Sequence, residues 1–160
     1  MPTPPFILEL RRHVGHMPLW LMGVTAVIVR EGSVLLGRRS DNGALTPITG
    51  IIDPREEPAD AAAREALEEA GVVIRVDRLA WMSVIPRVTY ENGDQTDYLD
   101  ITFRCSWVEG EPYPADGEMT HVAWYPLDAL ESLDGIDDDM RERISYALAD
   151  GPAAFLGGGR

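Results

Sequence analysis

The sequence lacks the features of secreted and membrane-spanning proteins. It contains one cysteine, Cys105, so no disulfide can form within the chain, and a reducing compartment suits this composition. We therefore expect a cytoplasmic protein. The apolar stretch 17–29 is too short to cross a bilayer as a helix, is interrupted by Pro18 and Gly23, and has no small-residue cleavage site. A buried strand is the better interpretation of this stretch.

Positive charge is also scarce. The chain has 14 Lys and Arg residues against 27 Asp and Glu residues, a formal net charge of -13. This excess argues against broad binding to a nucleic-acid backbone or an anionic membrane. Phosphates can still be bound through a few placed arginines and through divalent cations that bridge carboxylates to phosphate oxygens.

The length and composition are sufficient for one domain. At 160 residues and 45% hydrophobic content, the chain can bury a core without disulfides or metal ions. We expect a single domain over residues 1–160, with residues 1–5 and 157–160 flexible.

Turn and periodicity signals predict an α/β fold. Glu31-Gly32 and residues 91–94 supply turns between β-rich runs. Pro58 and Gly71 are placed to begin and end a central helix. Strands around one central and one C-terminal helix predict an α/β sandwich with a mixed sheet. We expect helices over residues 6–14, 58–70, 126–133 and 137–148, strands over 21–30, 33–39, 72–86, 98–108 and 120–125, and an extended segment over 45–52.

The predicted helix 58–70 carries its charges in an unfavourable place. Its apolar face is narrow and consists of Ala63, Ala66, Leu67 and Ala70. Glu65, Glu68 and Glu69 then cluster on the opposite, solvent-facing side. They repel one another at these spacings, and an anion near the helix C-terminus typically costs ~0.3–1 kcal/mol. A purely structural helix gains nothing from this arrangement.

A metal ion would account for the clustered glutamates. A hard divalent cation between the carboxylates would turn their repulsion into coordination. Ligands that are all oxygen favour magnesium or manganese over zinc, because no His or Cys occurs at zinc-ligand spacing. A solvated acidic face is the alternative. Arg64 either orients Glu68 through an i, i+4 ion pair or is an ordinary surface arginine.

A larger pattern contains this helix. Gly50 is followed by five residues and Glu56, then by seven residues and the run Arg-Glu-Ala-Leu-Glu-Glu-Ala-Gly-Val that begins at Arg64. The pattern resembles the Nudix box at every defining position. The preceding strands and the passage Trp-Tyr-Pro-Leu at 124–127 extend the resemblance to nearly the whole chain. Arg55 departs from it, because many members have glycine there and an arginine adopts a positive φ reluctantly.

The resemblance implies a MutT-like Nudix hydrolase with an α/β/α sandwich, in which the box forms a loop, a helix and a second loop. It implies that Glu56 supports the first loop and that Arg64 orients a helix carboxylate. It also implies that magnesium, with manganese as a substitute, is held by the Gly50 carbonyl, Glu65, Glu68 and Glu69.

The base that accepts a proton from the attacking water has two candidates. Glu65 is either a metal ligand or this base. Glu118, in the loop 114–118 before the last strand, is the second candidate, because family members use different carboxylates, some from this loop. The alternative for an exposed loop acid is that it is only solvated.

Arginines near strand ends are candidates for binding phosphates. For each one, a solvated or salt-bridged surface charge is an equally weighted alternative. The candidates are Arg38, Arg39, Arg87 and Arg104.

The resemblance implies magnesium-dependent hydrolysis of a diphosphate linkage in a nucleoside triphosphate, ADP-ribose, nucleotide sugar or dinucleoside polyphosphate. We expect a small nucleotide as partner, with no nucleic-acid polymer and no membrane, and a homodimer through the N-terminal helix is a hypothesis. One alternative is a Nudix-like module that binds a nucleotide without turnover, against which the intact glutamates argue. The other is an isoprenoid diphosphate isomerase. Such an enzyme is expected to have a catalytic cysteine, and Cys105 fits that role poorly.

Overall fold

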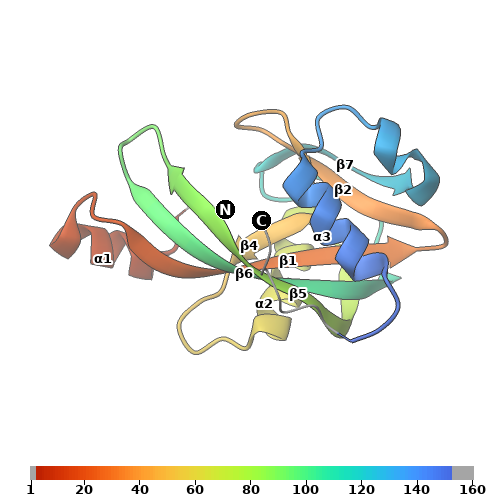
Figure 1. Cartoon of the computed structure of the whole chain (residues 1–160), viewed down its shortest axis with the longest axis horizontal. Coiled ribbons are helices and arrows are strands. Elements are labelled where there is room, and N and C mark those ends of the chain that lie inside the picture. Colours follow the sequence, from red (N-terminus) through yellow and green to blue (C-terminus); the bar gives the residue numbers. More distant parts are fainter. Residues whose placement is uncertain (1–2, 153–160) are drawn as a thin grey trace.

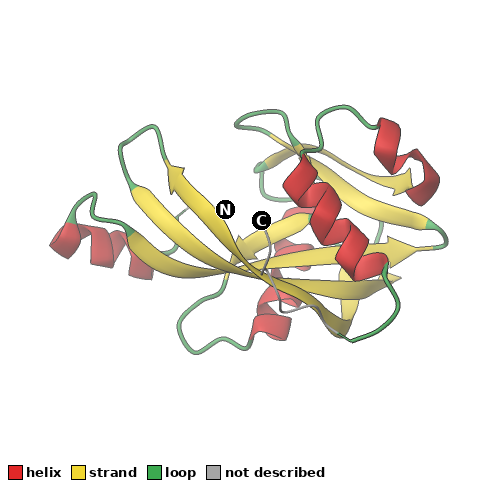
Figure 2. Ribbon diagram, in the orientation of Figure 1, coloured by secondary structure: helices red, strands yellow, loops and turns green. Residues whose placement is uncertain are grey.

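The computed structural model describes residues 3–152 as a mixed β-sheet with helices on both faces (Figures 1 and 2). The expected flexible residues 157–160, and the first two residues of the expected flexible segment 1–5, lie outside the described residues. Pro4 is buried, and helix α1 (Pro5–Val14) begins at the next residue. Within residues 3–152, no helix has the length and apolar character needed to cross a membrane.

The sheet combines parallel and antiparallel pairs. Its main path runs β3-β2-β1-β6-β5, with β4 paired to β1 and β7 paired to β2. β1 and β6 are parallel, and the other pairs are antiparallel. The strands are β1 (Leu19–Arg30), β2 (Ser33–Arg39), β3 (Leu45–Thr46), β4 (Ile48–Ile51), β5 (Val73–Thr89), β6 (Gln95–Glu109) and β7 (Met119–Pro126).

Both predicted hairpins are present. The β1–β2 turn places Glu31 and Gly32 at φ 47° and 78°, the left-handed conformations that a two-residue turn requires. The β5–β6 hairpin is longer than predicted, because β5 continues through Pro86 to Thr89. Proline is tolerated there because β5 is an edge strand and its pairing shifts register between Ile85 and Val88.

The central and C-terminal helices follow the sequence signals closely. α2 (Pro58–Ala70) begins at Pro58 and ends before Gly71, whose φ of 66° gives the left-handed cap. α3 (Asp138–Leu148) is capped by Asp137, whose side chain accepts a hydrogen bond from the Met140 backbone N–H. The helix expected over 126–133 is instead a short 3-10 helix, η1 (Leu127–Ser132).

Helices on the two faces of the sheet make the predicted α/β/α sandwich (Figure 2). The alanines of α2 pack in a cluster with Val24 and Ala26 of β1. On the other face, Ile144 and Ala147 of α3 pack in a cluster with Val27. Successive side chains of a strand point to opposite faces, so β1 supplies both cores.

α1 and the end of the β5–β6 hairpin extend the molecule beyond these layers (Figure 1). Ile7 of α1 packs on Leu19 and Leu21 of β1. Arg11 of α1 donates a hydrogen bond of 2.6 Å to the backbone carbonyl of Gln95 at the start of β6. α1 is therefore fixed to the far end of the sheet rather than lying free.

Candidate functional site

Two of the three glutamates of α2 are buried, contrary to the predicted solvent-facing cluster. Glu65 and Glu69 are 0% and 2% exposed, whereas Leu67, assigned to the apolar face by its spacing, is 55% exposed. Glu68 is the member that remains exposed. Alanines are small, so the helix lies close to the sheet and the glutamates beside its packed face are buried with it. That face consists of Ala61, Ala62, Ala66 and Ala70.

Glu65 occupies the space in front of Gly50 on β4. A Cβ on residue 50 would lie 2.1 Å from the Glu65 carboxyl carbon, so only glycine leaves room for this side chain. Burial raises the pKa of Glu65 to about 7, and the neighbouring Arg64 guanidinium acts in the opposite direction. The first glycine of the box and its first helix glutamate are thus in direct contact.

Glu69 belongs to a second group of acids. Carboxylate oxygens of Glu69, Asp116 and Glu118 lie within 4.8 Å of one another. Burial raises the pKa of Glu69 to about 8, and repulsion from Glu65 and Asp116 adds to this shift. The fold therefore brings the predicted loop acid Glu118 beside the helix, together with Asp116, which the sequence analysis did not select although it lies in the same loop.

Arg64 joins the first loop of the box to α2. Its guanidinium donates two hydrogen bonds to the Glu56 carboxylate, of 2.7 and 2.8 Å, and this pairing lowers the pKa of Glu56. It also donates to Glu65 at 2.8 Å and to Glu68 at 3.1 Å. Glu56 in turn accepts the Asp53 backbone N–H at 3.0 Å. One arginine thus holds the loop and two helix carboxylates in fixed positions.

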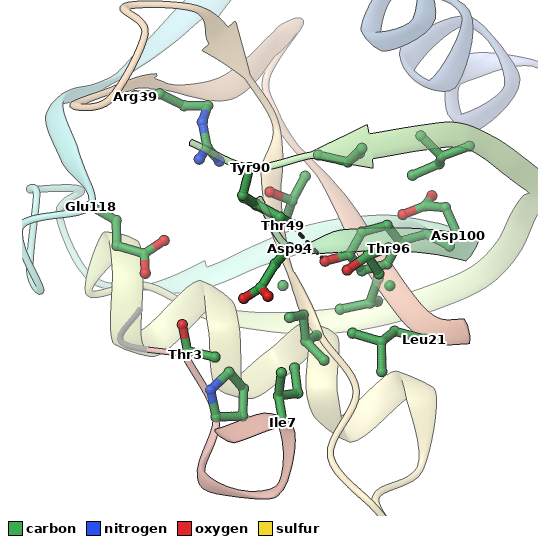
Figure 3. A pocket seen from close by; sticks show the side chains of 18 of the residues that line it. Thr3, Ile7, Leu21, Arg39, Thr49, Tyr90, Asp94, Thr96, Asp100 and Glu118 are labelled. Atoms are coloured by element: carbon green, nitrogen blue, oxygen red, sulfur yellow. Dashed lines mark hydrogen bonds between the residues drawn. The ribbon is translucent and has the colours of Figure 1, made fainter. Parts of the chain in front are cut away.

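A cavity of about 690 Å³ lies beside these acids, walled by α1, the β5–β6 hairpin, α3 and the sheet (Figure 3). Gly50, Glu69 and Glu118 line it together with Arg39. Figure 3 shows Arg39 and Glu118 on one side of the cavity and Asp100 on the other. The apolar part of the lining includes Ile7, Leu21, Ile51, Ile85 and Tyr98.

Of the four predicted phosphate-binding arginines, Arg39 alone lines this cavity among the described residues. It is held by two hydrogen bonds to Asp41, of 2.9 and 2.6 Å. Arg38 donates to a backbone carbonyl of the following turn, and Arg104 to a carbonyl near the end of α3. Arg87 pairs with an aspartate across the β5–β6 hairpin. These three arginines are not among the residues that line the cavity with the acids.

The sequence analysis missed a buried ion pair in the cavity wall. Arg143 of α3 and Asp100 of β6 are 1% and 2% exposed, with 2.8 Å between Nη1 and Oδ2. A signal for Asp100 was present, because an aspartate within an apolar strand requires a partner. Arg143 gave none, since an arginine on a helix is usually exposed.

Comparison with known proteins gives the family that the box pattern resembles. The NUDIX domain family matches residues 20–146. A MutT-like protein from Streptomyces ambofaciens is 30% identical over 138 residues, which cover 78% of this chain and 84% of that protein. An NAD-capped RNA hydrolase, NudC, from Chromobacterium violaceum is 29% identical over 110 residues, or 67% of this chain. The chain spans only 38% of that longer relative.

Solved structures show the same fold. A MutT protein from Bacillus halodurans superposes with a TM-score of 0.68 at 18% identity, covering 84% of this chain and 86% of that one. An ADP-ribose pyrophosphatase from Streptococcus suis gives a TM-score of 0.64 at 17% identity, covering 84% and 96%. At these identities the similarity concerns the fold alone.

Proposed function

The chain belongs to the Nudix hydrolase family, and we propose that it hydrolyses the diphosphate linkage of a nucleoside diphosphate joined to a second group, with magnesium bound at the α2 carboxylates. The observation that carries the proposal is the pair of buried glutamates, Glu65 and Glu69, of which Glu69 lines the cavity beside Glu118. No structural need of the helix explains two buried acids at these positions.

The carboxylates fit a divalent cation. Glu65 Oε2 and Glu69 Oε2 are buried and have no hydrogen-bond partner within residues 3–152. Buried carboxylate oxygens without partners are costly, and a hard cation satisfies them. We propose that magnesium, or manganese in its place, is held by the Gly50 carbonyl, Glu65, Glu68 and Glu69. When bound, the ion would acidify a water molecule and offset charge on the phosphates.

The remaining roles follow from position. We propose Glu118 as the base, because it lines the cavity, whereas Glu65 faces Gly50 and Arg64 and is absent from the lining. Arg64 and Glu56 would keep the glutamates in place, as their hydrogen bonds already do. Arg39, on the same side of the cavity as Glu118, would contact a phosphate oxygen (Figure 3).

The names of similar proteins define the substrates to test. They include a MutT-like protein, an NAD-capped RNA hydrolase and an ADP-ribose pyrophosphatase. Each of the last two activities concerns a diphosphate with an organic group on both sides. A cavity of about 690 Å³ is of the size that holds one small nucleotide.

The test is phosphate or nucleotide release from nucleoside triphosphates, ADP-ribose, NAD, nucleotide sugars and dinucleoside polyphosphates, with and without magnesium. We expect turnover of one class, dependent on the metal and nearly lost in Glu118→Gln. Glu109→Gln, an exposed acid at the end of β6, is the control and should keep full activity. Tight binding of one compound without turnover of any would replace the proposal with the nucleotide-binding module.

A further inference from the structure

The wall of the cavity opposite Glu118 is built around the buried aspartate Asp100 (Figure 3). Arg143 Nη1 lies 2.8 Å from Asp100 Oδ2 and 2.7 Å from Thr25 Oγ1. Arg143 also donates to Asp139 at 2.7 and 2.9 Å, and Thr102 donates to Asp100 Oδ2 at 2.9 Å. The carboxylate therefore has a fixed orientation and a charged partner.

The two oxygens of Asp100 differ in their partners. Oδ2 lies within hydrogen-bonding distance of Arg143, Thr102 and Thr25. Among residues 3–152, Oδ1 is hydrogen-bonded by Thr25 alone, at 3.0 Å, and the single hydroxyl proton of Thr25 is shared between the two oxygens. An ionised carboxylate oxygen accepts more than one hydrogen bond, so Oδ1 retains the capacity to bind a donor from a ligand.

Gly23 leaves space in front of Oδ1. A Cβ on residue 23 would lie 3.3 Å from Asp100 Oδ1 and 3.7 Å from the Gly50 carbonyl oxygen. Gly23 lines the cavity, as do Asp100 and Gly50. The free side of the carboxylate is therefore close to the glycine that begins the box.

We propose that Asp100 Oδ1 accepts hydrogen bonds from the hydroxyl groups of the sugar ring attached directly to the diphosphate. The inference rests on the proposed function, because the box locates the diphosphate. A phosphate is disfavoured at this wall, since the carboxylate would repel it, whereas a neutral sugar hydroxyl donates to an anionic oxygen favourably. A group that reaches both the box and Asp100 is the one bonded next to the phosphates.

The adjoining surface suits the base of the same nucleotide. Leu21 and Tyr98 occupy neighbouring positions on β1 and β6, and Ile85 pairs with Tyr98 on β5. All three line the cavity with Ile7 of α1. This apolar surface can accommodate a flat ring. It lies on the α1 side of Asp100 and is therefore further from the box than the proposed position of the sugar.

The experiment compares two ligands that the enzyme cannot cleave at the α,β linkage. α,β-methylene nucleoside diphosphates carrying each of the four RNA bases, and their 2′,3′-dideoxy forms, are titrated calorimetrically with magnesium present. For the base that binds best, we expect the hydroxylated form to bind about tenfold more tightly, as for a hydrogen bond to a charged acceptor. Gly23→Ala should reduce this ratio to near one, because the added methyl group fills the space before Oδ1.

The control is Ile85→Leu, which changes the cavity wall at the position paired with Tyr98 rather than with Asp100 and should keep the ratio. Equal binding of the two forms by the unaltered protein, absence of binding, or a ratio retained by folded Gly23→Ala would overturn the inference. If Gly23→Ala does not fold, the ratio in the unaltered protein decides. If the unaltered protein binds the hydroxylated ligand more tightly than the dideoxy ligand but hydrolyses no substrate, the proposed function alone is refuted. If it hydrolyses a substrate but binds the two ligands equally, this inference alone is refuted.

Discussion

Glu65 fills the space that a side chain on Gly50 would need, with its carboxyl carbon 2.1 Å from the position of the missing Cβ. The glycine that opens the box is therefore required by packing against the helix, in addition to any role of its carbonyl. Because Glu65 also accepts a hydrogen bond of 2.8 Å from Arg64, a displacement of its carboxylate would disturb both the first loop of the box and α2.

Gly50→Ala should lower both stability and activity. The Ala methyl group would force Glu65 out of its buried position, an overpacking that typically costs about 1–3 kcal/mol. Adding Glu65→Asp, which shortens the side chain, should recover most of the free energy of unfolding without recovering turnover. Denaturant unfolding and kcat of the two variants test this, and an unaltered stability of Gly50→Ala would contradict the packing argument.

Glu69→Gln should nearly abolish hydrolysis while stabilising the metal-free protein at alkaline pH. Glutamine cannot ionise, so the variant avoids burying a charge whose pKa is raised to about 8. We expect kcat to fall more than ~100-fold, beyond the effect typical of residues that only support ligands. Thermal unfolding with a chelator at about pH 9 and steady-state kinetics with magnesium measure the two effects. Glu109→Gln should leave both unchanged.

The metal-free protein should lose stability as the pH rises. The pKa values of Glu65 and Glu69 are raised from 4.5 to about 7 and about 8, so their contribution is complete below pH 4.5 and is lost as the pH passes these values. Magnesium binds the ionised forms, so its stabilising effect should grow over the same window. Melting temperatures with chelator and with magnesium test this. The double variant Glu65→Gln with Glu69→Gln should lose the pH slope, and a metal effect greatest at pH 5 would contradict the assignment.

Arg143→Met should destabilise the protein strongly. It leaves Asp100, which is 2% exposed, without its cationic partner, and breaking a buried pair in this way typically costs about 3–5 kcal/mol. Arg12→Met is the matched control, because Arg12 pairs with Glu9 on the exposed surface of α1 and such pairs contribute about 0–1 kcal/mol. Urea unfolding of both variants measures the difference, and similar losses would show that the Asp100 environment tolerates an unpaired charge.

Arg55→Gly should stabilise the first loop of the box. Arg55 adopts a φ of 74°, a left-handed conformation that costs a residue with a Cβ roughly 1–2 kcal/mol and glycine almost nothing. Part of this gain is offset by the greater conformational freedom of glycine in the unfolded chain. We therefore expect the free energy of unfolding to rise by about 0.5–1 kcal/mol. Arg55→Ala keeps the strain and should give no gain. Equal stabilities of the Gly and Ala variants would refute this explanation.

Local signals in the sequence determined the elements of the site. Pro58 and Gly71 set the ends of α2, because a first-turn proline and a left-handed glycine act on the backbone at their own positions. The spacing from Gly50 through Arg64 identified the family. The i, i+4 relation of Arg64 to Glu68 gave an ion pair as one of two alternatives, and the structure contains this contact at 3.1 Å. Each of these inferences needed only residues close in the chain.

The tertiary structure alone decided which charges are buried and what they face. Helical spacing assigned Glu65 and Glu69 to solvent, but close packing of the alanine face against the sheet buries both. The approach of Glu118 to Glu69, and of Arg143 to Asp100, joins segments more than forty residues apart, and periodicity carries no information on such distances. The sequence by itself thus determined the reacting groups of the box, whereas the cavity beside them exists only because α1, the β5–β6 hairpin and α3 meet around the sheet.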